Sequence, residues 1–530
     1  MASSLPAVLA AATATLAPLE RDANRAWWAA STQVTDEHEA ARIAADLAFR
    51  TALADAERFT AVRDSAPTGE PLVDRQRAVL HDLMLPHQVP DELREQIVRL
   101  EASIDATFNS HRPVLAGTPV DDNTISETLR TATDSTERRD AWEAAKTVGV
   151  AVADRVRDLA HARNEAARAL GYRDHFALSL ATAELDEAEL MATLDAIDAS
   201  TRAPFATWKH GDDVARAARF GCPPAELRPW HYDDPFFQGA PQDHELDVDA
   251  WFTDRDLPAL TAATYAGIGI DIGELLARSD LEPRAGKSQH AFCIDVDRDE
   301  DIRVLCNNVP GDYWTETMLH EFGHAVYDRF VDPELPWLVR TMHPLTTEGV
   351  AMLFGRLTGD PQWLRTVAGL DDAVVTAAEP RLARRQLLTR LVFARWVLVM
   401  TNFERAFYAD PDADHDTGWW DLVERFQLLT RPDDRHAPDW AAKIHVALAP
   451  VYYQNYLLGE LVASQLEATV RARFGGVIDT PEIGEFLRRE VFAPGWSCRW
   501  DELVAQATGA PLSVAPYAAE LADLARRSER

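Results

Sequence analysis

His320, Glu321 and His324 are the residues of this chain whose types and spacing most clearly indicate chemistry. Histidines four positions apart lie on one face of a helix, so both imidazoles can bind the same metal ion. Glu321 lies between them and can take a proton from a water molecule bound to that ion. The segment His320-Glu321-Phe322-Gly323-His324 therefore predicts a zinc site that activates water. The alternative is a core helix whose two histidines are only hydrogen-bonded.

A catalytic zinc ion needs a third protein ligand and one open position. One class of zinc enzymes has Gly three residues after the second histidine and His six residues after it. Tyr327 and Phe330 occupy those positions here, which excludes that class.

A carboxylate on a later helix is the other source of a third ligand. Glu348 lies 24 positions after His324, in the first turn of a helix that Pro344 is expected to begin. Glu334, which prolines flank, and His343, in the connecting segment, are the rival ligands. We expect Glu348 to complete the site.

The elements that must position these residues are mostly helices. The zinc motif falls in a helix expected over 313–330, which begins after Pro310-Gly311-Asp312 and ends before Pro333. Short β-prone runs at 291–296 and 302–306 predict a hairpin just before it. Residues 220–248 are rich in proline and aromatic side chains and are interpreted as an ordered loop. The other clear helical stretches are 40–62, 90–108, 126–171, 187–219, 380–409 and 451–473.

Composition narrows the class of protein. The 530 residues are 47% hydrophobic, enough for a large core, and the net charge of −33 argues against nucleic acid and anionic membrane surfaces as partners. The four cysteines form no CxxC pair, which indicates a reducing compartment. The first basic residue is Arg21, so the N-terminus lacks the charge of a signal peptide. The apolar run 391–400 is interrupted by Arg395 and is too short to span a membrane. We expect a cytoplasmic protein.

The order His-Glu-x-x-His and then Glu resembles the angiotensin-converting-enzyme-like zinc peptidases, of the gluzincin type. The thimet-oligopeptidase-like family is a more distant resemblance. The likeness also includes Glu137-Arg138-Arg139-Asp140-Ala141-Trp142-Glu143, the segment 162–172, and the C-terminal helices from Pro494-Gly495-Trp496 to about Leu521. It implies one Zn²⁺ per chain and a mostly α fold: a two-lobed helical ellipsoid with a deep channel and a small hairpin beside the zinc helix. Residues 1–20 would be an N-terminal extension and residues 21–525 a single catalytic domain.

Further site residues follow from this resemblance. His290-Ala291 lies where the family has the His-Ala pair of its substrate-binding strand, so both would hold the substrate backbone. Lys443-Ile444-His445 resembles the family's Lys-x-His, which makes His445 a donor to the oxyanion and Lys443 a ligand of a peptide's terminal carboxylate. Tyr453-Gln454-Asn455-Tyr456 resembles a Tyr-x-x-Tyr motif, in which Tyr456 stabilises the oxyanion and Tyr453 contacts substrate.

Several positions depart from the family pattern. One extra residue separates His445 from Tyr456, so Tyr452 or Tyr453 could take the oxyanion role. Asn455 replaces an arginine that binds chloride in animal members, so we do not expect chloride activation through that site. Tyr232 stands where the family has a glutamine or arginine that grips the substrate C-terminus.

The residue four positions after Glu348 also departs from the family. It is Met352 instead of an aspartate that would orient a zinc ligand. Glu316 and Asp328, each four residues from a predicted ligand, are the candidates to replace it.

The predicted function is zinc-dependent hydrolysis of short peptides, with dipeptides released from the C-terminus. Glu321 would be the general base, and His445 and Tyr456 would stabilise the oxyanion. Three alternatives remain: an oligopeptidase that cleaves internally, a hydrolase of a specialised amide, and a catalytically silent peptide-binding protein.

Overall fold

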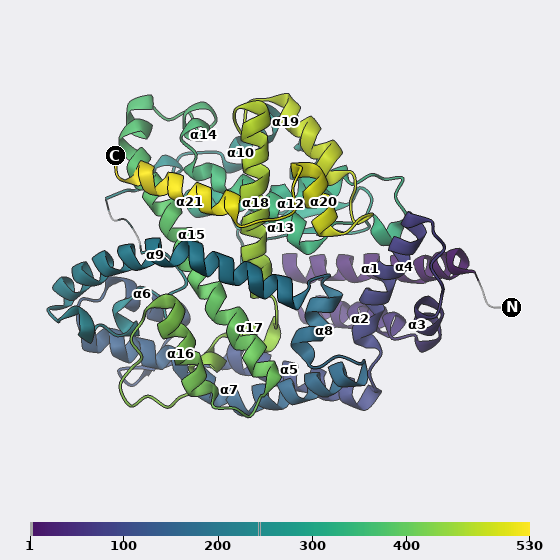
Figure 1. Ribbon diagram of the computed structural model, residues 1–530, viewed down its shortest axis with the longest axis horizontal. Coiled ribbons are helices and arrows are strands. Elements are labelled where there is room, and N and C mark those ends of the chain that lie inside the picture. The colour runs from purple at the N-terminus through teal and green to yellow at the C-terminus, as the bar shows by residue number, and fades with distance from the viewer. Residues whose placement is uncertain (1–3, 242, 244) are drawn as a thin grey trace. The chain divides into compact units, whose positions relative to one another are not determined.

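The computed structural model describes residues 4–241, 243 and 245–530. Helices hold 70% of the residues and strands 2%, which confirms the prediction of a mostly α fold (Figure 1). The chain forms two compact units, and each is described by itself. Unit 1 comprises Met1–Gln88, His244–Ala383 and Leu458–Arg530, and unit 2 comprises Val89–Asp243 and Arg384–Leu457. Residues 1–3 of the predicted N-terminal extension and residues 242 and 244 of the predicted loop lie outside the described residues.

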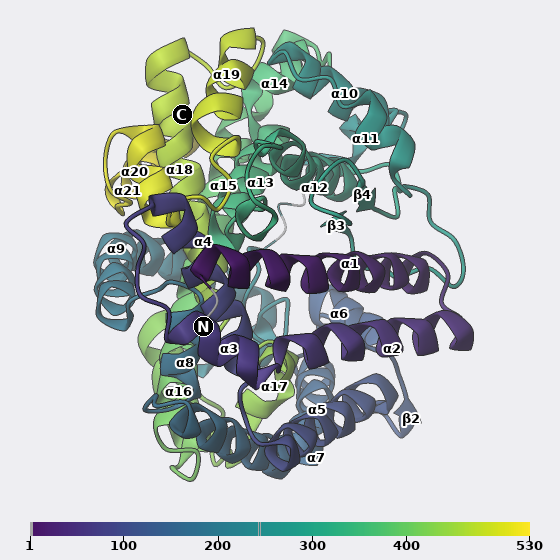
Figure 2. The ribbon, with the colours of Figure 1, turned by 90° about the vertical axis from the view of Figure 1, so that its right-hand side faces the viewer.

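Unit 1 contains the zinc motif and the predicted hairpin. Its helices are α1 (Leu5–Thr32), α2 (Asp36–Leu53), α3 (Ala56–Arg63), α4 (Pro71–Met84), α10 (Leu257–Gly267), α11 (Gly273–Arg278), α12 (Asp312–Phe330), α13 (Pro344–Gly355), α14 (Pro361–Thr366), α19 (Pro481–Phe486), α20 (Trp500–Thr508) and α21 (Ala515–Ser528). It also includes the start of α15 (Asp372–Ala409), up to Ala383. Of α18 (Tyr453–Phe474), it includes the part from Leu458 onward. Helices α1 and α2 run side by side (Figure 2).

The hairpin of unit 1 lies against the zinc helix, as predicted. Strands β3 (Phe292–Asp295) and β4 (Ile302–Leu305) are antiparallel, with Phe292 opposite Leu305 and Asp295 opposite Ile302. Both strands pack on α12 (Figure 2). Ile294, Ile302 and Val304 of the hairpin are buried. The hairpin therefore brings residues 290–295 next to the zinc motif.

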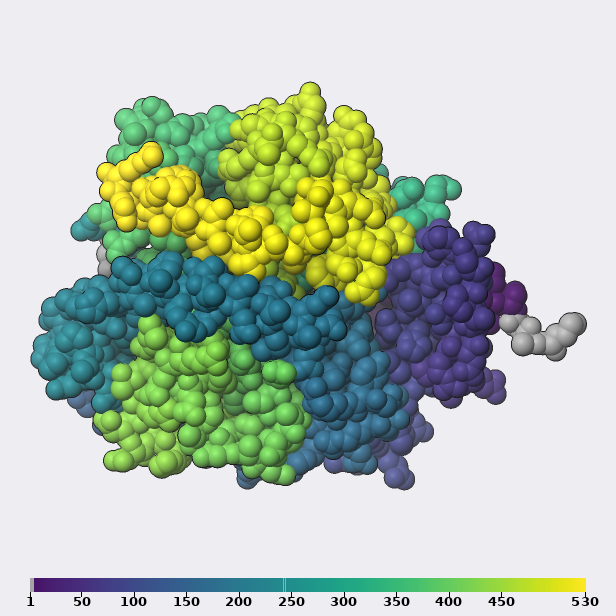
Figure 3. All heavy atoms as spheres, in the orientation of Figure 1, coloured from purple at the N-terminus to yellow at the C-terminus, as the bar shows by residue number. Residues whose placement is uncertain are grey.

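Unit 2 contains the two long helices α7 (Ser135–Ala169) and α9 (Glu187–Phe220). Its other elements are α5 (Asp91–Ser110), α6 (Asp122–Thr131), α8 (His175–Thr182), the rest of α15, α16 (His415–Gln427), α17 (Ile444–Leu448), the start of α18 and a minimal hairpin of β1 (Val114–Leu115) and β2 (Thr118–Pro119). Figure 3 shows α9 lying along the green segment that contains α16. Helix α9 is fastened to α15 by Arg395, whose guanidinium donates to Asp198 and Thr201. Among the described residues, no helix combines the length and apolarity that a membrane crossing requires.

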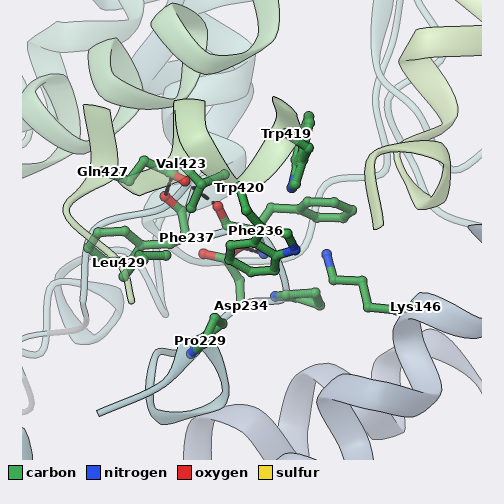
Figure 4. Close-up of a pocket in the computed structure, with 11 residues that line it drawn as sticks. Lys146, Pro229, Asp234, Phe236, Phe237, Trp419, Trp420, Val423, Gln427 and Leu429 are labelled. Atoms are coloured by element: carbon green, nitrogen blue, oxygen red, sulfur yellow. Dashed lines mark hydrogen bonds between the residues drawn. The ribbon is translucent and has the colours of Figure 1, made fainter. Parts of the chain in front are cut away.

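The Pro-rich aromatic segment of unit 2 is an ordered loop, as predicted. The Asp234 carboxylate accepts the backbone N–H groups of Phe236 and Gln238. The Gln427 amide donates to the carbonyls of Phe236 and Phe237 at 3.0 and 2.8 Å (Figure 4). These contacts satisfy backbone groups that a helix or sheet would otherwise pair, which stabilises this part of the loop.

Two predicted helices are each divided in the structure. The stretch 40–62 forms α2 and α3, and 126–171 forms α6 and α7. Asp55 and Asp134 stand at the two breaks, where their carboxylates accept backbone N–H groups of the helix that follows. An aspartate at such a position stabilises a new helix start more than it stabilises continuation.

Candidate active site

Helix α12 presents the zinc motif from a well-anchored start. The Asp249 carboxylate accepts the backbone N–H of Asp312 at 2.9 Å, which caps the helix. Leu319, Phe322 and Val326 are fully buried on its inner side, as the apolar pattern predicts. Phe330, predicted on that side too, is only half-buried.

The structure brings His320, His324 and Glu348 together. Their candidate ligand atoms all lie within 4.8 Å of one another. The two Nε2 atoms are 3.3 Å apart, and Nε2 of His320 is 3.7 Å from Oε2 of Glu348. The side chains of His320 and Glu348 keep 26% and 15% of their surface exposed. One side of the group is therefore open.

This donor set fits zinc in kind and in spacing. Bonds of about 2.0–2.1 Å at tetrahedral angles place neighbouring ligand atoms roughly 3.3 Å apart. Two imidazoles and one carboxylate are the ligands of several catalytic zinc sites, in which the fourth position is open. The three residues could hold a zinc ion with little movement.

The charges at this group also favour a cation. Burial lowers the pKa of His320 to about 4 and that of His324 well below its usual value, so both imidazoles are neutral at pH 7. Burial raises the pKa of Glu348 to about 7. Burial, with a smaller contribution from Glu348, raises the pKa of Glu321 to about 8. Two buried carboxyl groups without a compensating positive charge are the setting that a divalent cation stabilises.

Glu321 is held by the neighbouring strand. It is 8% exposed, and its carboxylate accepts the backbone N–H of Cys293 on β3. Backbone groups two residues apart in an extended segment face the same edge, which places those of Ala291 on the edge that meets Glu321. His290 is exposed, and its backbone N–H points to the Ser288 hydroxyl at 3.4 Å. His290 and Ala291 thus lie directly before β3, near the proposed base.

Close backbone packing fixes α13 against its neighbours. A Cβ atom on Gly323 would lie 2.8 Å from Cα of Ala351, so only glycine allows α12 and α13 to approach this far. On the other side of α13, a Cβ on Gly349 would lie 2.4 Å from a methyl of Val462 on α18. The position of Glu348 therefore depends on two glycines.

The rival third ligands have other places. Nδ1 of His343 accepts the backbone N–H of Leu345 at 3.1 Å, so this buried histidine caps the start of α13. Glu334 is exposed in the turn after α12. Neither residue belongs to the metal-ligand group, which contains Glu348 alone from this part of the chain as the structure describes it.

The predicted orienting carboxylates do not account for His324. Its Nδ1 lies 2.6 Å from the hydroxyl oxygen of Thr347, the residue before Glu348. Asp328, one of the two candidates, instead contacts the Cys293 thiol at 3.9 Å between sulfur and oxygen. Glu316, the other, lies beside Gly355 near His320, so it remains a candidate for that ligand.

The remaining predicted site residues gather in unit 2. The Lys443 ammonium donates to Oε1 of Gln238 at 2.8 Å and lies 5.3 Å from the ring centre of Phe236. Burial lowers its pKa to about 8, against a smaller opposing effect of Asp234. Lys443 has three donors, and Gln238 takes one of them. Two of its three donors therefore remain for acceptors other than Gln238.

Sequence analysis did not identify Gln238 as a partner of Lys443. Tyr232, at the position where the family has a substrate-gripping side chain, does not contact Lys443 through its hydroxyl. The Tyr232 hydroxyl is buried between Lys209 and Asp213, at 2.6 Å from each. Gln238 lies six residues further on in the same loop and reaches Lys443 across 205 residues of sequence. No local motif marks it; only the folded loop brings the two together.

His445 and the tyrosines form an aromatic group with one unsatisfied nitrogen. The rings of His445 and Tyr453 lie 4.8 Å apart, and those of Tyr453 and Tyr456 5.8 Å apart. Nδ1 of His445 is buried without a hydrogen-bond partner, and burial lowers the pKa of the imidazole to about 4. A proton on Nε2 avoids a buried N–H without an acceptor, so His445 is a neutral donor through Nε2. Tyr453 is 4% exposed, whereas Tyr456 is half-buried.

The loop before these tyrosines is strained. Val451 has a φ of +54°, a conformation that β-branched residues rarely adopt. Its backbone N–H donates to Oε1 of buried Glu404 at 2.8 Å. This contact holds the turn between α17 and α18, and with it the placement of Tyr453 relative to His445.

Comparison with known families gives independent support. Residues 3–204 match the family model described as angiotensin-converting enzyme, which confirms the resemblance drawn from the motifs. The match includes the segments 137–143 and 162–172 but ends before the zinc motif. The motif and the match are therefore two separate observations. A search of curated proteins finds no match. The family supports a zinc peptidase in general terms and peptides as its substrates.

Proposed function

We propose that this protein hydrolyses peptide bonds with one zinc ion held by His320, His324 and Glu348. The observation that carries the proposal is the spacing of the three donor atoms, with Glu321 buried beside them and an exposed side left open. When bound, zinc would polarise the attacking water and the scissile carbonyl. Action in the cytoplasm stays a prediction.

Glu321 would be the general base and then the general acid. Its carboxylate takes the proton of the attacking water and passes it to the leaving amine. The N–H of Cys293 keeps the carboxylate oriented during both transfers. The backbone of Ala291, with His290, would pair with the substrate backbone along the edge that meets Glu321.

The roles of the unit 2 residues rest on the family resemblance and on their chemistry. His445 would donate Nε2–H, and Tyr456 its hydroxyl, to the oxygen that becomes negative in the tetrahedral intermediate. His445 is neutral at pH 7, and a neutral donor suits stabilisation of a developing negative charge. Tyr453 would contact the substrate beside His445.

We further propose release of dipeptides from the C-terminus. The Lys443 ammonium, with the amide of Gln238, is a receptor for a terminal carboxylate: one cationic group, a second hydrogen-bonding group and low exposure. Internal cleavage by an oligopeptidase is the second candidate, because Tyr232 departs from the family pattern at this end of the substrate.

Substitution of Glu321 tests the hydrolysis. Glu321→Gln keeps the size of the side chain and loses the base, so turnover of a fluorogenic peptide should fall by about 10²–10⁴-fold. Zinc content, measured by mass spectrometry of the metal, should not change. Glu334→Gln, the same exchange at an exposed position, is the matched control. Near-wild-type turnover of Glu321→Gln would overturn the mechanism.

Product mapping tests the position of cleavage. Mass spectrometry of products from one peptide with a free and with an amidated C-terminus should show dipeptide release from the free form only. Equal internal cleavage of both forms would favour the oligopeptidase instead. Zinc binding without cleavage of any peptide would favour the silent binding protein.

A further inference from the structure

We propose that Thr347 is a positioning residue of the metal site, which orients His324 in place of a carboxylate. This inference rests on the proposed zinc site. The observation behind it is the 2.6 Å distance between Nδ1 of His324 and Oγ1 of Thr347. Thr347 is 8% exposed, so water does not compete strongly for this contact.

The nitrogen that faces the metal position decides the direction of this hydrogen bond. A zinc ligand must offer a lone pair, and Nε2 of His324 is the nitrogen that lies near His320 and the open side. A nitrogen that binds zinc carries no proton, so the ring proton of a zinc-bound His324 is on Nδ1. Nδ1–H then donates to the Thr347 hydroxyl oxygen, and this hydrogen bond holds the ring with Nε2 toward His320.

The packing of α12 on α13 makes this contact possible. Gly323 allows the backbones to approach until a Cβ would be 2.8 Å from Cα of Ala351. Thr347 lies one turn before Ala351 and reaches back to His324, one residue after Gly323. Because Thr347 and Glu348 are consecutive, one turn of α13 supplies both a ligand and the partner of another ligand.

A neighbouring threonine with a different role provides the control. Thr346 is also buried, and its hydroxyl donates to the carbonyl of His343 at 3.0 Å and lies 3.3 Å from the Tyr327 hydroxyl. It contacts no predicted metal ligand through these bonds. Removing its hydroxyl should affect folding at least as much as the same change at Thr347, but not the metal.

The test compares zinc affinity in three variants of the full chain. Competition with a chromophoric chelator should show that Thr347→Val binds zinc about 10- to 100-fold more weakly than wild type. Thr347→Ser, which restores the hydroxyl, should recover most of the affinity. Thr346→Val should bind zinc as wild type does. Circular dichroism of the apo-proteins verifies that each variant is folded.

The outcomes separate this inference from the proposed function. Wild-type protein that binds no zinc would overturn the proposed metal site itself. Wild-type protein that binds zinc, with Thr347→Val of equal affinity, would overturn only the role of Thr347. Equal losses in Thr347→Val and Thr346→Val, or no recovery in Thr347→Ser, would assign the effect to helix packing and also overturn it. If Thr347→Val does not fold, the Thr347→Ser and Thr347→Ala variants decide the question by the same measurement.

Discussion

Two histidines, one in each unit, are held in opposite ways. His324 has Thr347 as a partner for Nδ1 at 2.6 Å, whereas Nδ1 of His445 is buried and has none. Burial lowers the pKa of both imidazoles, so both are neutral at pH 7. The difference lies in orientation: a metal ligand gains from being fixed before the ion arrives, and a donor to substrate can be aligned when substrate binds.

The helices that carry the two histidines also differ in length and in how they are packed. His324 stands in the middle of a 19-residue helix that packs backbone to backbone on α13. His445 stands on the five-residue α17, next to the strained turn at Val451. We infer that the predicted metal ligand is preorganised and that the predicted oxyanion donor adapts when substrate binds.

Gly323→Ala should give the largest effect, because it disrupts the close packing of α12 on α13. The new methyl would meet backbone of α13, so the helices must separate and Glu348 and Thr347 must move. We expect loss of zinc binding and a fall of about 1–3 kcal/mol in the free energy of unfolding. Urea denaturation and metal analysis measure both. Unchanged zinc affinity would contradict the rigid-scaffold interpretation.

Tyr456→Phe should give the next largest effect, on the adaptable side of the comparison. Loss of one donor to the oxyanion reduces kcat by about 10²–10³-fold. Tyr453→Phe is the matched control. It should have a smaller effect on kcat, because Tyr453 is buried and only 4% exposed. A larger loss in Tyr453→Phe would transfer the oxyanion role to Tyr453.

Deprotonation of Lys443 should have a moderate effect on KM, which a pH series of the wild-type protein measures. Its pKa of about 8 means that the ammonium is charged below pH 8 and loses its proton above it. KM for peptides with a free C-terminus should rise roughly tenfold per pH unit well above pH 8, with no such rise for amidated peptides. Lys443→Arg keeps its charge and should remove the rise. A pH-independent KM in the wild type would argue against Lys443 as the carboxylate receptor.

Gly211→Ala should give the smallest effect and is the counterpart of Gly323→Ala in unit 2. Gly211 lies within α9, and a Cβ there would meet nothing within 4 Å. Alanine should raise the free energy of unfolding by about 0.5–1 kcal/mol and leave turnover unchanged. Thermal unfolding and a peptide assay suffice for this measurement.

Local sequence signals were sufficient for most of the helices and for the grouping of His320, His324 and Glu348. His320, Glu321 and His324 share one helix turn, and Pro344 marks the start of the helix that carries Glu348. Helix breaks at Asp55 and Asp134 were missed, since helix-forming residues continue on both sides and a single capping side chain decides the break.

Residues that act through tertiary contacts were not predictable. Thr347 is visible next to Glu348, but its partner is set by how closely α12 and α13 approach. Gln238 meets Lys443 only because a Pro-rich loop folds back on the unit that contains it. Met352 stands where the family has an aspartate, and two carboxylates were considered in its place; in the structure Nδ1 of His324 contacts Thr347, and Asp328 contacts Cys293.

The edge of β3 that does not pair with β4 also bears on aggregation. A strand edge that receives a substrate backbone could equally receive a strand from another chain, the first step of aggregation. Here the strand has four residues, and the amide of Asn24 on α1 donates to the carbonyls of Asp295 and Val296 at its far end. With a net charge of −33, copies of the chain also repel one another. The proposed substrate edge is therefore short and a poor template for a neighbouring molecule.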